Sequence, residues 1–180
     1  MTEYRHPMND LKKLIREVPD FPKPGILFYD ITTLLKDARG LGRLTEALVS
    51  RYRDQPPDLI AGIEARGFMF GPVMASHLGR GFVPIRKPGK LPAANIRVTY
   101  DLEYGTDSLE IHKDAIQPGQ RVLIVDDLLA TGGTALATCQ LVENLGGVVS
   151  GVAFVIELRF LKGRERLAKY DIFSVLQYDK

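Results

Sequence analysis

The sequence predicts an α/β fold: a single domain with a central, mostly parallel, twisted sheet flanked by helices. Four apolar runs are short enough to be strands and nearly free of polar residues: 59–63, 82–85, 122–125 and 148–156. Stretches with helical patterning separate the first run from the second and the third from the fourth. Near-continuous apolar strands that alternate with helices are typical of a parallel sheet covered on both faces.

The first part of the chain predicts two helices around an irregular segment. Apolar residues recur at helical spacing over 11–18, so we expect an amphipathic helix to open the chain. A proline cluster over 19–24 ends this helix, and residues 26–32 alternate like a short extended piece. Apolar residues at a spacing near four predict a second helix over 41–52.

Two βα units follow, with a polar insertion between them. The first unit contains a helix that ends at Leu78, and the second contains a helix over about 134–145. The insertion over 87–115 is rich in charge and tyrosine, with weak strand signals at 97–100 and 108–112. Long polar insertions in compact domains are more often functional than part of the core, so we predict a flap.

The composition is that of an ordinary globular chain of 180 residues, 45% hydrophobic and 26% charged. No repeat or linker divides it, so we expect one domain over residues 1–180. The net charge of +2 is too small for broad binding to nucleic acid, and no apolar stretch is long enough to span a membrane, so we expect neither partner. Cys139 is the only cysteine, which favours a reducing, cytoplasmic location.

The most informative segment is 122–134, which reads VLIVDDLLATGGT. Asp126 and Asp127 follow a buried strand, and ligands of open α/β sheets bind at the carboxyl ends of the strands. The next loop offers small and hydroxylated residues ahead of a helix, namely Ala130, Thr131, Gly132, Gly133 and Thr134. Its amides and hydroxyls suit a phosphate monoester, and the two carboxylates suit neighbouring hydroxyl groups. The segment therefore predicts a site for a phosphorylated ribose.

Other classes of site lose their defining signals. The chain contains neither G-x-x-x-x-G-K-[ST] nor G-x-G-x-x-G, which disfavours P-loop hydrolysis and dinucleotide binding. His6, His77 and His112 are scattered without ligand spacing, so we expect no metal site built from protein side chains. The string VLIVDD also opens receiver domains, but it stands at the N-terminus there and begins at residue 122 here.

At the ribose-phosphate segment the sequence resembles the type I phosphoribosyltransferase family, whose motif is a hydrophobic strand, an acidic pair and a T-G-G-T turn. Further blocks resemble the adenine-specific members of that family, in family order over nearly the whole chain. These blocks are FPKPGILFYDIT at 21–32, EARGFMFG at 64–71, IRKPGKLP at 85–92, LEYG at 102–105 and LRFLKG at 158–163.

The resemblance implies an enzyme of purine salvage that transfers the 5-phosphoribosyl group from phosphoribosyl pyrophosphate to adenine, giving AMP and pyrophosphate. It implies Mg²⁺ as a cofactor, bound mainly by pyrophosphate oxygens, ribose hydroxyls and water rather than by a protein ligand. It also implies a homodimer, in which a basic residue near Arg86 would serve the neighbouring site. A base-binding N-terminal hood over about 1–35 and a flexible flap over 87–115 complete the implied architecture.

The resemblance also implies roles for individual residues. Asp126, Asp127 and the loop at 130–134 would bind the phosphoribosyl group. The cations near pyrophosphate would be Arg66, Arg86, Lys87 and Lys90, of which Arg66 also counts as catalytic. The family's turn before Arg66 contains a non-proline cis peptide.

The flap and the hood would supply the remaining groups. Glu103 would assist proton transfer at the imidazole ring of the base, and Tyr104 would help to order the closed flap. Adenine would contact the backbone of Leu27 and Tyr29, with Leu158 as an apolar wall. The family often carries Arg at the position of Tyr29.

Two alternatives within this superfamily stay open. A phosphoribosyltransferase for xanthine or hypoxanthine would share residues 126–134 but should lack the blocks at 21–32 and 102–105. A non-catalytic, purine-sensing regulator would need an attached DNA-binding element, which the short first helix does not supply.

Overall fold

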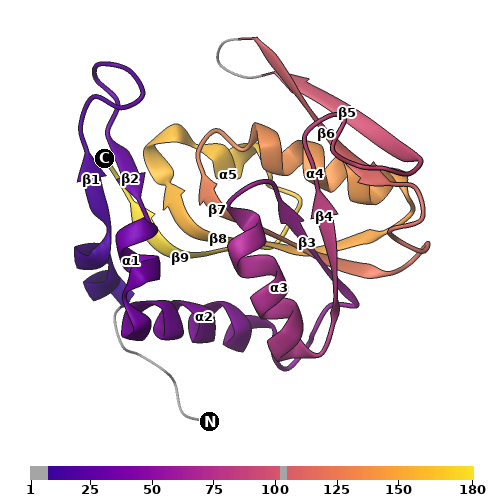
Figure 1. The fold of residues 1–180 in the computed structure, drawn as a ribbon, viewed down its shortest axis with the longest axis horizontal. Helices are drawn as coiled ribbons and strands as arrows, with labels where there is room; N and C mark the ends of the chain where they lie inside the picture. Colours follow the sequence, from indigo (N-terminus) through magenta and orange to yellow (C-terminus); the bar gives the residue numbers. More distant parts are fainter. Residues whose placement is uncertain (1–7, 102–104) are drawn as a thin grey trace. The chain divides into compact units, whose positions relative to one another are not determined.

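The structure is a computed structural model that describes residues 8–101 and 105–180. Its internal contacts divide the chain into two compact units, residues 1–47 and residues 48–180, and each is described by itself (Figure 1). The helix α2 (Ala38–Tyr52) contains the boundary and confirms the helix expected over 41–52.

The described part of the first unit contains a small antiparallel strand pair and short helical segments. In chain order these are the 3-10 helix η1 (Met8–Leu14), β1 (Arg16–Val18), β2 (Phe28–Asp30), α1 (Thr32–Lys36) and the first part of α2. Strand β1 pairs with β2 so that Arg16 lies opposite Asp30 and Val18 opposite Phe28.

The amphipathic helix predicted over residues 11–18 is wrong, because the helical segment ends at Leu14 and the chain continues as β1. The Leu14 carbonyl accepts a hydrogen bond from Thr33 Oγ1 at 2.6 Å, and Arg16 Nε donates to Asp30 Oδ2 at 3.0 Å. Leu11 and Ile15 are buried in this arrangement, as they would be on a helix. The apolar spacing therefore could not separate the two outcomes, and distant partners decided between them.

The second unit contains a five-stranded parallel sheet in the order β4-β3-β7-β8-β9, which confirms the predicted fold class. The strands are β3 (Leu59–Ile63), β4 (Gly81–Ile85), β7 (Arg121–Leu129), β8 (Val148–Leu158) and β9 (Ile172–Tyr178). The central strands β7 and β8 are almost continuously apolar and buried. A sheet covered on both faces selects such runs, because neither face of the strand meets water.

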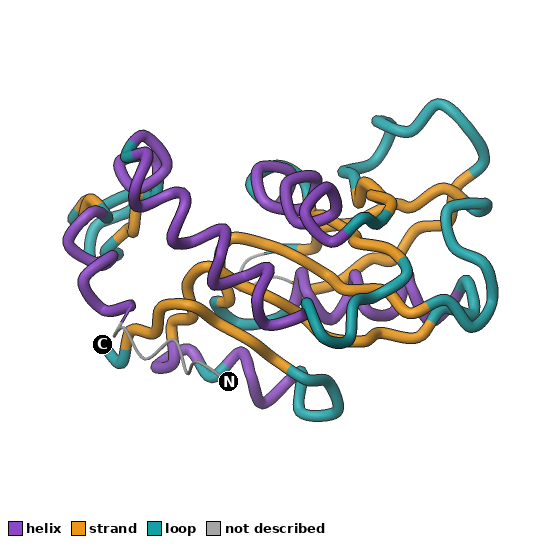
Figure 2. Tube along the Cα trace, turned by 90° about the horizontal axis from the view of Figure 1, so that it is seen from below, coloured by secondary structure: helices purple, strands orange, loops and turns teal. Residues whose placement is uncertain are grey.

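Helices cover both faces of this sheet. Helix α3 (Gly67–Leu78) connects β3 to β4, and α4 (Gly133–Asn144) connects β7 to β8. The two connections leave the central β3–β7 pair in opposite directions, and right-handed crossovers then place α3 and α4 on opposite faces. Figure 2 shows strands of the sheet lying between helices. After β8 come the short helices η2 (Arg159–Leu161) and α5 (Gly163–Arg166).

The predicted flap is an antiparallel hairpin of β5 (Asn95–Asp101) and β6 (Thr106–His112), which confirms both weak strand signals (Figure 1). Leu109 and Ile111 are fully buried in the same core cluster as α4, whereas the other strand contributes partly buried apolar residues. The hairpin therefore packs on α4 through one side and carries polar residues on the other.

Helix α4 also carries the single cysteine. Cys139 is fully buried among the core residues of the second unit. Burial raises the pKa of its thiol to about 12. In the described ranges, no helix is both long and apolar enough to cross a membrane.

Candidate active site

Strand β7 runs through the acidic pair instead of ending before it. The expected end was Val125, but β7 continues to Leu129 because its pairing with β8 continues to Leu129 opposite Glu157. The pairing of β7 with β3 ends at Val125. Asp126 and Asp127 thus lie on a part of β7 that pairs with β8 but not with β3. This part is next to the point where the β3–α3–β4 and β7–α4–β8 connections diverge. This is where open α/β sheets bind ligands.

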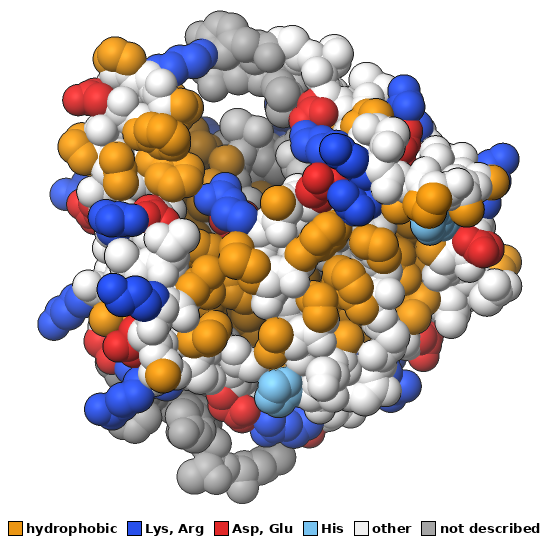
Figure 3. All heavy atoms as spheres, in the orientation of Figure 1, with side chains coloured by type: hydrophobic (Ala, Val, Ile, Leu, Met, Phe, Trp, Pro, Cys, Tyr) orange, Lys and Arg blue, Asp and Glu red, His pale blue; other side chains and the backbone are white. Residues whose placement is uncertain are grey.

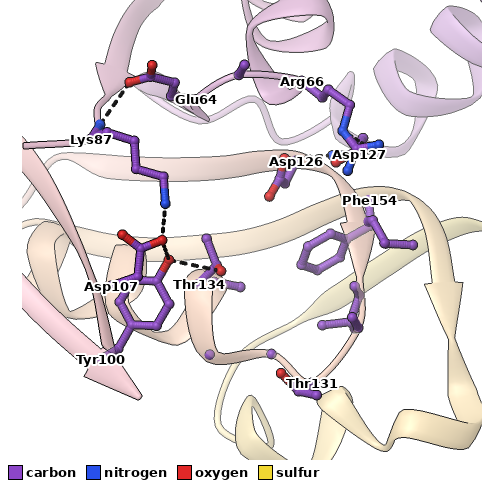
Figure 4. A pocket seen from close by; sticks show the side chains of 17 residues that line it. Glu64, Arg66, Lys87, Tyr100, Asp107, Asp126, Asp127, Thr131, Thr134 and Phe154 are labelled. Carbon is purple, nitrogen blue, oxygen red and sulfur yellow. Dashed lines mark hydrogen bonds and ion pairs between the residues drawn. The ribbon is translucent and has the colours of Figure 1, made fainter. Parts of the chain in front are cut away.

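One cavity of about 340 Å³ brings together most of the residues predicted for the sugar phosphate and pyrophosphate (Figure 4). The predicted residues that line it are Arg66, Lys87, Asp126, Asp127, Ala130, Thr131, Gly132, Gly133 and Thr134. They come from the α3 turn, the loop after β4, and the β7–α4 segment, all within the second unit.

The loop from Ala130 to Thr134, here called the phosphate loop, leads directly into α4. Gly132 is the N-cap of that helix, with a φ of 82° that favours glycine. The first amides of a helix have no acceptor within it, so those of the phosphate loop are free to bind an anion. With the Thr131 and Thr134 hydroxyls they form a cradle suited to a phosphate.

The phosphate loop touches the segment after β8 backbone to backbone. A Cβ added to Gly132 would lie 2.6 Å from the Gly163 carbonyl oxygen, and one added to Gly163 would lie 2.2 Å from the Ala130 carbonyl oxygen. Arg164 fixes this segment by a two-point ion pair with the buried Glu157, at 2.9 Å and 2.6 Å. The segment therefore supports the loop from behind.

The two adjacent carboxyl groups carry the unusual electrostatics of the site. Burial raises the pKa of Asp126 well above its ordinary value, and the neighbouring Asp127 carboxylate raises it further. Burial also raises the pKa of Asp127, against the opposing charge of Arg66. Arg66 Nε lies 2.9 Å from Asp127 Oδ2, and the Asp127 amide donates to Asp126 Oδ1 at 2.9 Å. Ligands that donate hydrogen bonds here would stabilise the ionised pair.

A tight turn places Arg66 over this pair. Arg66 is the N-cap of α3, and the peptide between Glu64 and Ala65 is cis, as the family resemblance implied. A Cβ on Gly67 would lie 2.6 Å from the Val125 carbonyl oxygen, so only glycine allows the helix to start this close to β7. The close approach delivers the Arg66 side chain to Asp127.

The other predicted cations divide into those inside and outside the cavity. Lys87 lines it, and its backbone amide donates to Glu64 Oε2 at 2.8 Å. Arg86 does not line it: its Nε donates to the same Glu64 oxygen at 2.9 Å, and its guanidinium lies 5.7 Å from the Phe68 ring centroid. The Lys87 amide and Arg86 together lower the pKa of Glu64, which also feels the exposed Lys90.

The sequence assigned no role to several residues that line the cavity, among them Glu64, Tyr100, Asp107 and Phe154. Glu64 is the first residue of the EARGFMFG block, so the family motif already contained it. Tyr100 and Asp107 flank the LEYG block on opposite strands of the hairpin and lie directly across from each other. Phe154 lies in the middle of an apolar strand and carries no signal that distinguishes it from core.

The residues predicted for adenine are not among those that line this cavity. Leu27 is exposed and Tyr29 is buried, and both belong to the first unit. Leu158 is 8% exposed at the end of β8 in the second unit. Glu103 and Tyr104 lie outside the described residues.

No group of three His, Cys, Asp or Glu side chains within residues 8–101 and 105–180 is arranged to hold a metal ion. The cavity nevertheless offers carboxylate oxygens, which Mg²⁺ prefers as ligands. Its donor chemistry thus fits a hard cation that brings most of its own ligands.

Comparison with known proteins identifies the family. A profile of the phosphoribosyl transferase domain matches residues 30–178. An adenine phosphoribosyltransferase of Solibacter usitatus is 66% identical over 173 residues, which cover 96% of this chain and 100% of the relative. The chain belongs to the adenine phosphoribosyltransferase family.

Solved adenine phosphoribosyltransferase structures have the same fold. That from Thermoanaerobacter pseudethanolicus is 57% identical with a TM-score of 0.92, and the match covers 95% of this chain and 99% of that one. The Saccharomyces cerevisiae structure, a complex with an imino-altritol bisphosphate and adenine, is 43% identical with a TM-score of 0.88, covering 94% and 98%. As a member of this family the chain is a transferase, and neither a regulator nor an enzyme for another base is favoured.

Proposed function

We propose that the chain transfers the 5-phosphoribosyl group of phosphoribosyl pyrophosphate to adenine, giving AMP and pyrophosphate in purine salvage. The observation that carries the proposal is one cavity where a phosphate loop, two strand carboxylates and the cations Arg66 and Lys87 meet. These groups match the three parts of the donor: its 5′-phosphate, its ribose hydroxyls and its pyrophosphate. Adenine as the acceptor follows from the names of the relatives.

The sugar phosphate would be bound by the β7–α4 segment. The amides and hydroxyls of the phosphate loop would bind the 5′-phosphate. Asp126 and Asp127 would accept hydrogen bonds from ribose hydroxyls, each worth about 1.5–3 kcal/mol because the acceptor is charged. A strand places these carboxylates more rigidly than a loop would, which suits groups that must hold the ring during displacement.

Displacement breaks the bond from the anomeric carbon to a pyrophosphate oxygen and forms a bond to a ring nitrogen of adenine. Negative charge grows on pyrophosphate while the ribose gains oxocarbenium character, so cations at the leaving group stabilise the transition state. Arg66 would bind pyrophosphate through its guanidinium fork, and Lys87 would act as a mobile point charge. Arg86 and Lys90 would add positive charge next to the cavity.

The remaining roles concern the base and its proton. Leu27 and Tyr29 would contact adenine through their backbone, and Leu158 would form an apolar wall. The acceptor nitrogen must lose a proton, which Glu103 would assist while Tyr104 orders the closed flap over 87–115. The family resemblance of the LEYG block supports the roles of Glu103 and Tyr104.

Mg²⁺ would enter with phosphoribosyl pyrophosphate. Asp126 and Asp127 would hold it indirectly, through the ribose hydroxyls and water that surround it. When bound, the ion neutralises charge on pyrophosphate as that group leaves.

We assign the activity to the cytoplasm as part of this proposal. The single, buried Cys139 supports this assignment, because chains that fold without disulfides are typical of reducing compartments.

A base panel tests the proposed function. The protein is mixed with phosphoribosyl pyrophosphate and Mg²⁺, and adenine, guanine, hypoxanthine and xanthine are offered separately while the nucleotide formed is measured. We expect AMP from adenine at a rate at least 100-fold above that of the other products. Equal use of hypoxanthine or xanthine, or no nucleotide from any base, would contradict the proposal.

A homodimer is part of the same proposal, and an apolar face on α3 supports it. Met69 and Val73 lie one helical turn apart and are each 39% exposed. In Figure 3, orange apolar side chains gather over the region where α3 and β4 lie in Figure 1. Exposed apolar patches of this kind mark association surfaces. A basic residue near Arg86 would then serve the neighbouring site.

Placing a charge on this face should separate the subunits. We expect Val73→Asp to be monomeric in light scattering after gel filtration, with an unchanged circular dichroism spectrum, because association would bury the aspartate unpaired. Val148→Asp is the matched control, since Val148 is also an exposed apolar residue, at 52%, but lies at the start of β8. A dimeric Val73→Asp protein would remove α3 as the interface.

A further inference from the structure

A continuous chain of polar contacts crosses the cavity from the phosphate loop to Lys87 (Figure 4). Thr134 Oγ1 donates to the Tyr100 hydroxyl at 3.2 Å, and that hydroxyl donates to Asp107 Oδ2 at 3.3 Å. Lys87 Nζ donates to the same Asp107 oxygen. The Asp107 carboxylate of the hairpin is thus paired with the Lys87 ammonium group, which the proposed function assigns to pyrophosphate.

The backbone holds both partners of this ion pair in place. The Ser108 amide donates to Asp107 Oδ1 at 2.8 Å, which leaves Oδ2 turned toward Lys87. The Lys87 amide is bound to Glu64 Oε2. Tyr100 lies across the hairpin from Asp107, so the two strands present the hydroxyl and the carboxylate together. The contact is built into the hairpin and the loop after β4, and it does not depend on a long, freely rotating acidic side chain.

Both groups of the pair are charged at neutral pH. Burial opposes the charge of Lys87, but the hydrogen bond to Asp107 and the neighbouring negative charges together outweigh it, so the pKa of the ammonium is raised. Burial likewise opposes the charge of Asp107, and Lys87 and the Ser108 amide outweigh it, so the pKa of that carboxyl is lowered. The side chains are 40% and 26% exposed, so an anion entering from water can reach the ammonium.

We propose that Asp107 is an internal competitor of pyrophosphate: a positioning residue that pairs with Lys87 and weakens the binding of pyrophosphate there. This inference rests on the proposed function, because it takes pyrophosphate as the anion that Lys87 meets. An anion that reaches Lys87 either displaces Asp107 or binds beside its carboxylate. In both cases its binding is weaker than at an unpaired ammonium.

The sign of the change in pyrophosphate affinity shows whether Asp107 competes with pyrophosphate or only orients Lys87. If Asp107 merely oriented Lys87 for its ligand, neutralising Asp107 would weaken binding. If Asp107 competes, Asp107→Asn removes one negative charge from the cavity but keeps an oxygen that accepts hydrogen bonds from Lys87 and Tyr100. We therefore expect the variant to bind pyrophosphate more tightly, a gain that damage to the fold cannot produce.

The test compares the full-length protein and its Asp107→Asn variant by isothermal titration calorimetry with inorganic pyrophosphate and Mg²⁺. We expect the Kd of pyrophosphate to fall at least threefold. The KM for phosphoribosyl pyrophosphate should fall in the same direction, whereas kcat should not rise, because tighter binding of the leaving group slows its release. Thermal unfolding checks that the variant is folded.

Asp114→Asn is the matched control, because Asp114 is an exposed carboxylate just beyond β6 and gives the same change in net charge. It should leave the Kd of pyrophosphate unchanged. The inference would be overturned if folded Asp107→Asn bound pyrophosphate no more tightly than wild type, or if Asp114→Asn showed an equal gain in affinity. In either case, AMP formation by the wild type would leave the proposed function intact. A wild type that neither binds pyrophosphate nor makes AMP would overturn both.

Discussion

Gly163→Ala should lower kcat/KM for phosphoribosyl pyrophosphate about 100-fold, although Gly163 belongs to none of the motif residues that line the cavity. The new Cβ would lie 2.2 Å from the Ala130 carbonyl oxygen and 3.0 Å from the Gly132 amide nitrogen. Both are backbone atoms of the phosphate loop, so neither can turn aside as a side chain would. The clash is relieved only if the loop or the α5 segment moves.

The loop is the part that should move, because the α5 segment is anchored on its other side. Arg164 is held by Glu157, and Leu167 is fully buried in the core. Displacing a substrate-positioning group by about 1 Å can cost about 100-fold in rate. Steady-state kinetics with varied phosphoribosyl pyrophosphate measure the loss, and calorimetry with AMP shows whether phosphate binding is lost with it.

Gly42→Ala is the control for this substitution. Gly42 lies in α2 and a Cβ added there meets no atom within 4 Å, so alanine should preserve the kinetics. If Gly163→Ala is folded by circular dichroism and keeps kcat/KM within threefold of wild type, the segment after β8 does not determine the position of the phosphate loop.

Asp127→Asn and Arg66→Ala should each lower turnover at least tenfold, but only Arg66→Ala should also lower stability. The side-chain amide introduced by Asp127→Asn would be a weaker acceptor for ribose hydroxyls than the carboxylate, and a charge-assisted hydrogen bond of about 1.5–3 kcal/mol corresponds to about 10- to 100-fold. Arg66→Ala removes the guanidinium proposed for pyrophosphate. Initial rates of AMP formation measure both losses.

The stability of the two variants follows from the raised pKa values in the cavity. A carboxyl group whose pKa is raised by folding contributes stability at low pH and loses it as the pH rises through the folded-state pKa. An amide at this position does not ionise as the pH rises, so Asp127→Asn should melt no lower than wild type. Arg66→Ala leaves Asp127 buried without this partner at 2.9 Å and should melt lower.

Thermal unfolding at neutral pH measures this contrast. Glu143→Gln is the control, because it makes the same carboxylate-to-amide change in a surface pair with Lys169. Glu143 lies in the last turn of α4, at the opposite end of that helix from the phosphate loop. If folded Asp127→Asn formed AMP at the wild-type rate, the ribose-binding role of Asp127 would be wrong. The same result for folded Arg66→Ala would exclude its role at pyrophosphate. A lower melting temperature for Asp127→Asn than for Arg66→Ala would contradict the electrostatic account.

The inner strands β3, β7 and β8 were predictable because they are buried on both faces and therefore carry a signal within their own residues. The runs at 59–63 and 148–156 required no knowledge of their neighbours. The start of the chain was not predictable in this way. Whether residues 16–18 form a helix or a strand depends on Asp30 and Thr33, which the local pattern does not contain.

The candidate site likewise contains residues that were predictable from a local motif and residues that were not. Asp126, Asp127 and the phosphate loop are contiguous, so one motif contained them all. Tyr100 and Asp107 enter the cavity only through the pairing of two hairpin strands, and Gly163 reaches the phosphate loop only through the fold. Such residues have ordinary identities in sequence, and their importance arises from non-local packing that no spacing rule expresses.

The location of the lone thiol gives the molecule an intrinsic reporter. Cys139 stands in the helix that begins at the phosphate loop, shielded from solvent and held in its protonated, unreactive form. A thiol-specific reagent can modify it only when that helix opens, so the rate of modification reads the frequency of opening directly. Occupancy of the phosphate loop would slow that reaction, and binding would become visible without a dye, a tag or a substituted side chain.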